Sequence, residues 1–198
     1  MSLVHQLPLP RRLVLLLGAA ALLRAGRSHA HASFGPVQPE QPAPKLQVTG
    51  MDGKAFDLVG ALKGQVTALQ LIYTGCSATC PIQGAVFAQT QALLAAHDKG
   101  RDIRLLSVSI DPLGDDVKGL RAWLGRHGAQ PQRWTAALPS MQQVDPLLDF
   151  LRGRAAGPDR HTAQAFIFDR RARLMHRTED MPAPQSLANL LLSVSGRG

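Results

Sequence analysis

Residues 73–81 read Tyr73-Thr74-Gly75-Cys76-Ser77-Ala78-Thr79-Cys80-Pro81 and contain both cysteines of the chain. An apolar run typical of a central β-strand precedes them at 65–73, and apolar residues at helical spacings follow them at 81–98. The sequence therefore predicts two thiols on one sharp turn between a strand and a helix. Their Cys-x-x-x-Cys spacing is one residue wider than that of dithiol oxidoreductases, which favours metal capture over disulfide exchange.

The rest of the chain extends this unit into a mixed α/β sheet. A hairpin is expected from 45–48 and 55–58, because the Asp-Gly pair at 52–53 tolerates the positive φ of a tight turn. Period and turn residues also predict strands at 103–110, 165–169 and 173–177, and helices at 115–127 and around 187–194. This order predicts a thioredoxin-like fold: a mixed central β-sheet flanked by helices, with an N-terminal β-hairpin.

One periodic segment, 140–151, contains an internal proline. A proline lacks the backbone N–H that a helix interior needs, but it suits the first turn. We therefore expect this helix to begin at Pro146, with Asp145 as its cap.

The chain divides into three parts. Its 198 residues, 45% hydrophobic and 18% charged, suit one globular domain, which we expect at 44–198. Residues 1–32 have two arginines, an apolar stretch and then small residues, which predicts a secretory signal. The apolar stretch is shorter than the ~20 residues of a membrane-spanning helix, so a membrane anchor is the weaker alternative. Residues 33–43 are rich in Pro and Gln, and we expect a flexible leader there.

The net charge and the expected cellular compartment reduce the number of possible functions. Removing residues 1–32 deletes four arginines and no acid, so the formal charge falls from +8 to +4. The remaining basic residues are scattered without interleaved aromatics, which argues against a nucleic-acid partner and leaves membrane association open. Export to the periplasm, or to the extracytoplasmic face of a membrane, makes a structural disulfide the default for two cysteines. A bridge across four positions closes a very small loop, however, and stabilises the fold little.

Three motifs together resemble the Sco/SenC family of copper proteins. They are the cysteine motif at 73–81, Ser-Val-Ser-Ile-Asp-Pro at 107–112, and His161-Thr162 shortly before Ala-Phe-Ile-Phe-Asp at 165–169. The similarity runs from about Pro44 to the C-terminus. It implies a thioredoxin-like domain that binds copper through Cys76, Cys80 and His161. It also implies a metallochaperone that delivers copper to, or helps to mature, the copper centre of a respiratory cytochrome c oxidase.

The residue chemistry agrees with copper. Thiolates suit Cu(I), and an added imidazole makes a site acceptable to Cu(II) as well. Pro81 suits the first position of a helix, so we expect Cys80 to lie at the positive end of the helix dipole with a lowered pKa. Asp111 ends the neighbouring strand and is a candidate for a carboxylate near the metal, with a plain Asp-Pro turn as the alternative.

Two positions depart from the family pattern. Members often have proline after the first cysteine and an acid before the histidine, where this chain has Ser77 and Arg160. A cation beside His161 disfavours a metal ion there unless Arg160 points outward.

Three functions stay open. The first is a copper metallochaperone that is not an enzyme, acts as a monomer, and meets the copper-site subunit of an oxidase or another copper chaperone. The second is a periplasmic thiol-disulfide reductase that acts on the oxidase's copper-binding cysteines and needs Cys76 and Cys80 but not His161. The third is a redox-sensing or copper-sensing partner in signalling.

Overall fold

Strand β4 (Val66–Ile72) forms the centre of the sheet, and all seven of its residues are buried. The computed structural model describes residues 34–97, 100, 102–156 and 160–197. A nearly continuous apolar run suits a strand that is covered on both faces. On one side β4 pairs in parallel with β5 (Ile103–Ser109), and on the other it pairs antiparallel with β7 (Ala165–Phe168).

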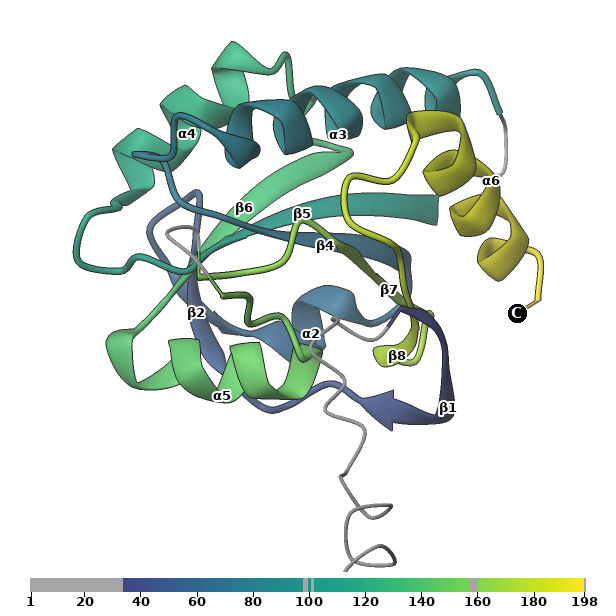
Figure 1. Ribbon diagram of the computed structural model, residues 1–198, viewed down its shortest axis with the longest axis horizontal. Coiled ribbons are helices and arrows are strands. Elements are labelled where there is room, and N and C mark those ends of the chain that lie inside the picture. The colour runs from purple at the N-terminus through teal and green to yellow at the C-terminus, as the bar shows by residue number, and fades with distance from the viewer. Residues whose placement is uncertain (1–33, 98–99, 101, 157–159, 198) are drawn as a thin grey trace, which may run out of the picture. The chain divides into compact units, whose positions relative to one another are not determined.

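The outer strands extend the sheet in both directions. Strand β6 (Trp134–Pro139) runs parallel to β5, and β8 (Arg173–Arg177) runs antiparallel to β7. The predicted hairpin is confirmed as β2 (Gln47–Gly50) and β3 (Ala55–Asp57), and β2 also pairs with β6. With β1 (Gly35–Pro42) on the far edge, the described residues form a sheet in the order β1-β8-β7-β4-β5-β6-β2-β3 (Figure 1).

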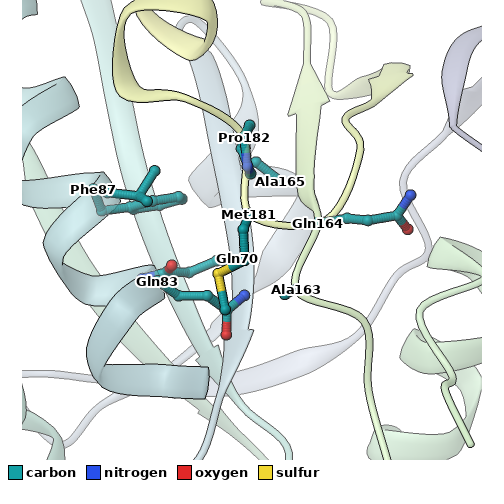
Figure 2. A pocket seen from close by; sticks show the side chains of 9 residues that line it. Gln70, Gln83, Phe87, Ala163, Gln164, Ala165, Met181 and Pro182 are labelled. Carbon is teal, nitrogen blue, oxygen red and sulfur yellow. The ribbon is translucent and has the colours of Figure 1, made fainter. Parts of the chain in front are cut away.

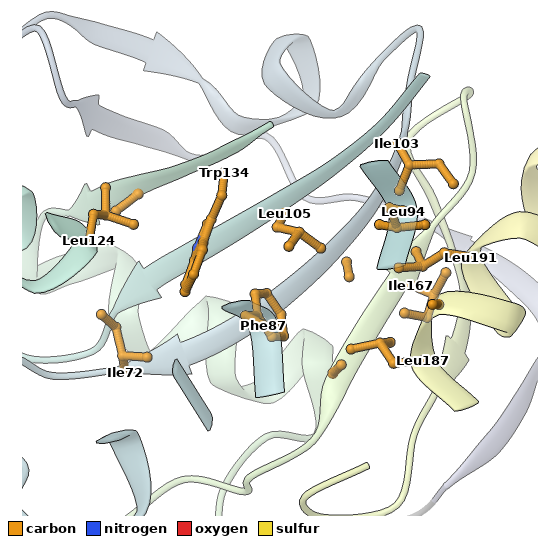
Figure 3. Packing of buried hydrophobic residues seen from close by; sticks show 14 of the residues in the cluster. Ile72, Phe87, Leu94, Ile103, Leu105, Leu124, Trp134, Ile167, Leu187 and Leu191 are labelled. Atoms are coloured by element: carbon orange, nitrogen blue, oxygen red, sulfur yellow. The ribbon is translucent and has the colours of Figure 1, made fainter. Parts of the chain in front are cut away.

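Helices cover both faces of this sheet. Helices α3 (Thr79–Ala95), α4 (Val117–Arg126) and α6 (Pro184–Ser195) lie over one face, and α2 (Leu58–Leu62) and α5 (Met141–Leu151) lie over the other (Figure 1). Figure 3 shows the core under α3 and α6, where Phe87 packs 5.7 Å from Trp134, measured between ring centroids. Cys76 and Cys80 belong to this same buried cluster.

Strand β1 corrects the expected flexible leader at 33–43. Gly35–Pro42 pairs antiparallel with β8, and Val37 is buried in the core under α2 and α5. The side chain of Arg173 also holds Glu40, with Nε 3.1 Å from Oε2. Proline is tolerated here because an edge strand needs partners on one side only. The folded domain therefore begins before the predicted Pro44, and the described residues from Phe34 onward belong to one compact unit.

Helix α5 corrects the expected start at Pro146. It begins at Met141, with Ser140 as the N-cap, and it carries Pro146 in its interior. Its buried residues lie on both sides of the proline: Val144, Leu147, Leu148 and Leu151. Burial of this apolar face outweighs the single backbone hydrogen bond that Pro146 cannot donate.

The secretory signal predicted at 1–32 lies outside the described residues. In the part of the chain that the structure describes, every helix is too short or too polar to cross a membrane.

Candidate metal centre

The cysteine turn leaves the carboxyl end of β4 and enters α3. Cys76 is 9% exposed, and its backbone N–H donates to the carbonyl of Tyr73 at 3.2 Å, which closes the turn. Cys80 lies in the first turn of α3 and is fully buried. Its backbone N–H points at the Sγ of Cys76, 3.3 Å away. The N–H of Cys80, which has no partner within the helix, thus points at the sulfur of the first cysteine of the motif.

The two thiols differ in acidity. Burial raises the pKa of Cys76, but hydrogen bonds from the backbone and side chain of Cys80 and from Thr79 outweigh burial and lower this pKa from 9.0 to about 7. Burial raises the pKa of Cys80 to about 12, and the nearby charge of Cys76 adds to the rise. The expectation that the helix dipole makes Cys80 the acidic thiol is therefore wrong. The helix also begins at Thr79 rather than Pro81.

His161 reaches the same place from a distant loop. It is 4% exposed and forms an isolated bridge with Arg154, just before β7. Its Nε2 lies 4.0 Å from the Sγ of Cys80, and its Nδ1 lies 2.9 Å from the carbonyl oxygen of Thr162. Because a carbonyl only accepts hydrogen bonds, we assign the ring proton to Nδ1. The lone pair of Nε2 then faces the buried thiol, as a ligand nitrogen must.

One aromatic residue and one charged residue lie next to His161. The ring of Tyr73 meets the imidazole edge-on, with centroids 6.1 Å apart. Arg160, the residue before His161, has a positive φ of 57° and is exposed. Solvent therefore screens the positive charge of Arg160 from His161.

Asp115, not Asp111, is the carboxylate that contacts the cysteine turn. Asp111 accepts from the N–H of Gly114 at 3.1 Å, which is the plain turn role named as its alternative. Asp115 is buried, and it accepts from the N–H of Thr74 at 3.0 Å and from the hydroxyl of Thr74 at 2.5 Å. It also accepts from the hydroxyl of Ser109 at 2.6 Å. This residue ties the start of the cysteine turn to the end of β5.

Sequence reasoning missed Asp115, although it left a signal. Two acids stand together at 115–116, and a helix needs only one cap. Asp116 is that cap, because its side chain accepts from the N–H of Gly119. The second acid had no role in the predicted elements, which is a reason to expect a tertiary contact.

The donor atoms fit a soft metal ion. Nε2 of His161 lies 4.0 Å from Sγ of Cys80, and Sγ of Cys76 lies 3.3 Å from the backbone nitrogen of Cys80, so two sulfurs and one imidazole nitrogen lie in the same region. This set suits Cu(I) and is acceptable to Cu(II). Within the described ranges, no group of three or more His, Cys, Asp or Glu side chains is spaced to hold a metal ion.

The SCO1/SenC family profile matches residues 38–194. The chain belongs to the SCO1/SenC family. A SCO1 protein homolog from Bacillus subtilis (strain 168) is 32% identical over 83 residues, which is 42% of this chain and 42% of that protein. The match thus spans about two fifths of this curated relative.

Two solved structures share the thioredoxin-like plan and confirm the expected fold. Yeast Sco1, crystallised with copper bound, has a TM-score of 0.66 at 14% identity, over 77% of this chain and 87% of that one. BsSco has a TM-score of 0.68 at 19% identity, over 85% of this chain and 100% of that one. BsSco is described as having a disulfide switch and as a member of the Sco family of cytochrome c oxidase assembly proteins.

Proposed function

We propose that this SCO1/SenC protein is a copper metallochaperone that delivers copper to, or helps to mature, the copper centre of a cytochrome c oxidase. One observation carries the proposal: Nε2 of the buried His161 lies 4.0 Å from Sγ of Cys80. The two residues are 81 positions apart in the chain. Burying a histidine with its lone pair toward a cysteine is the arrangement that a nitrogen-sulfur metal site requires.

Copper is the cargo of this site, and the three side chains have different parts in its capture. Cys76, with a pKa of about 7, supplies a thiolate near neutral pH. Cys80 is protonated there and releases its proton when its sulfur binds. His161 needs no proton loss at Nε2. Three protein donors leave one position through which a recipient's thiolate can enter and take the ion by ligand exchange.

The proposed surroundings follow from the same function. We place the domain in the periplasm or at the extracytoplasmic face of a membrane, because residues 1–32 have the pattern of a secretory signal. The recipient is the copper-site subunit of the oxidase, and another copper chaperone is a candidate supplier. The protein acts as a monomer in this proposal.

A second candidate, a thiol-disulfide reductase, is favoured by the unequal acidity of the two thiols. The Cys76 thiolate would attack a partner's disulfide, which forms a mixed disulfide and releases one partner thiolate. Cys80 would then lose its proton and attack the sulfur of Cys76. The partner leaves as a dithiol, and Cys76 and Cys80 are oxidised to a disulfide. An external thiol must reduce this pair before another cycle.

Copper titration of the reduced protein separates the two functions. We expect one copper per chain and a sulfur-to-Cu(II) charge-transfer band. The His161→Ala variant should lose at least about 100-fold in copper affinity, because a ligand matters more than its outer neighbours do. His97→Ala, at the exposed end of α3, is the matched control and should bind as the parent does.

Reduction of a disulfide substrate by the same variants gives the opposite test. A reductase tolerates His161→Ala and loses activity with Cys76→Ser. If the reduced parent binds no copper and turns over disulfides, the metallochaperone proposal is wrong.

A further inference from the structure

A small, partly open cavity between α3 and the sheet is lined by two buried amide side chains. Gln83 lies on α3, three residues after Cys80, and is 3% exposed, while Gln70 lies on β4 and is 1% exposed. Both line the cavity together with Ala163 and Met181. Figure 2 shows Gln70, Gln83 and Met181 gathered around it, whereas the amide of Gln164 points away.

The amide of Gln70 is held at one end only. Its Nε2 donates to the hydroxyl of Ser107 at 2.9 Å, and the same hydroxyl accepts from the indole N–H of Trp134 at 2.9 Å. Among the described residues, Oε1 of Gln70 and both amide atoms of Gln83 lack a hydrogen-bond partner. Buried amide atoms are unfavourable unless they are hydrogen-bonded.

The cavity has the size and polarity of a hydration site. Its volume of about 10 Å³ corresponds to a single water molecule. A water can donate to Oε1 of Gln70 and accept from Nε2 of Gln83, so one molecule bridges the two side chains. The thioether of Met181 is only a weak acceptor and cannot replace it.

We propose that a buried water bridges Gln70 and Gln83 and makes Gln83 a positioning residue for Cys80. The bridge completes a polar chain from Trp134 on β6 through Ser107 on β5 and Gln70 on β4 to Gln83 on α3. Residues three apart on a helix share one side, so a tie at Gln83 fixes the depth of Cys80. The distance between Cys80 and His161 depends on that depth.

The Gln83→Met variant tests the water, because a hydrated and a dry cavity predict changes of opposite sign. Methionine keeps the length of the side chain and removes the amide. With a bridging water, the variant loses a long-lived water in ¹⁷O magnetic relaxation dispersion, and its urea midpoint falls. With a dry cavity, removal of an unsatisfied amide raises the midpoint and leaves the relaxation unchanged. Either of these last two results would overturn the proposal.

Gln91→Met is the matched control on the same helix. The amide of Gln91 is buried but paired, because it donates to the carbonyl of Gly128 at 3.0 Å and accepts from the N–H of Gln130 at 2.8 Å. This variant should lower the urea midpoint and retain the relaxation signal. A loss of the signal in both variants would mean that the water lies elsewhere, and it would also overturn the assignment.

The positioning role has its own measurement, which rests on the proposed copper function. Gln83→Met should shift the sulfur-to-Cu(II) charge-transfer band and lower copper affinity several-fold, while Gln91→Met should leave the band in place. An unshifted band in a variant that has lost the water would refute the positioning role. If the parent itself binds no copper, the proposed function fails, whereas the relaxation result still decides the water.

Discussion

Cys76 and Cys80 have the same functional group and lie four residues apart, yet their environments act on them in opposite directions. The sulfur of Cys76 lies in front of the N-terminus of α3 and accepts a hydrogen bond from the N–H of Cys80 at 3.3 Å. Cys80 belongs to the first turn itself, and its side chain is packed underneath the helix with no exposure. The pKa falls to about 7 for Cys76 and rises to about 12 for Cys80.

This contrast shows what a helix N-terminus stabilises. Its N–H groups lower the pKa of a group that lies in front of them, where their hydrogen atoms point. A side chain of the first turn receives less of this effect, and its own burial decides its pKa. One turn of helix thus supplies both a thiolate and a protonated thiol, which suits a pair whose members act in sequence.

The largest expected effect is on alkaline stability. Below pH 9 the thiol of Cys80 is protonated in both the folded and unfolded states, so it contributes no pH dependence. Between pH 9 and about 12 only the unfolded state loses this proton, and the free energy of unfolding falls by up to about 1.4 kcal/mol per pH unit. Urea titrations with a reductant that keeps both thiols reduced should show this fall in the parent and a smaller one in Cys80→Ser.

The contribution of Cys76 to the free energy of unfolding should change with pH in the opposite direction, so Cys76→Ser is the internal control. Its thiol is ionised in the folded state above pH about 7 but only above pH 9 when unfolded, so it adds stability as the pH rises through that window. Equal pH profiles for the two serine variants would show that the thiols do not differ as described.

The next effect is on thiol reactivity. In single-cysteine variants at pH 7.5, we expect iodoacetamide to modify Cys76 about 100-fold faster than Cys80. The thiolate fraction favours Cys76 by more than this factor, and the greater nucleophilicity of a less acidic thiolate offsets part of it. Rates measured from pH 6 to 10 should show a midpoint near 7 for Cys76. Comparable rates at pH 7.5 would contradict the difference in environment.

The same contrast marks where sequence reasoning succeeds. The strand, turn and helix around the cysteines could be predicted because the apolar run of β4 and the helical period of α3 are local patterns. The depth of Cys80 could not, since it depends on packing against residues distant in the sequence. Strand β1 was missed for a related reason: it has one buried apolar residue, Val37, and is stabilised by pairing with β8.

The site shows the same division between local and tertiary information. Cys76 and Cys80 stand out in the sequence through their spacing. His161 stands out only through its place in a family motif and its position near one end of a predicted strand, because nothing near it in the sequence indicates a buried imidazole. Asp115 was passed over in favour of Asp111, since the contact that gives it a role is to Thr74, 41 residues away.

Substitution of Asp115 has the smallest expected effect and is the most selective test of the difference between Cys76 and Cys80. Its carboxylate accepts from Thr74 and Ser109, and an amide has only one acceptor oxygen for these donors. We expect Asp115→Asn to lower the free energy of unfolding by about 2 kcal/mol, because charge-assisted hydrogen bonds inside the protein are lost. Asp111→Asn is the matched control and should change stability by less than about 0.5 kcal/mol, since asparagine suits the same turn.

The effect of Asp115→Asn on the two thiols should be unequal. Thr74 lies two residues before Cys76, so loosening it disturbs the turn that presents the Cys76 sulfur to the N–H of Cys80. The midpoint of Cys76 alkylation should therefore move upward from about 7 toward 9. Cys80 is held by the burial of α3 rather than by the turn, so its reaction should stay slow. A variant that accelerates Cys80 while leaving Cys76 unchanged would mean that Asp115 supports the helix and not the turn, and the separation between the two thiols would then need another cause.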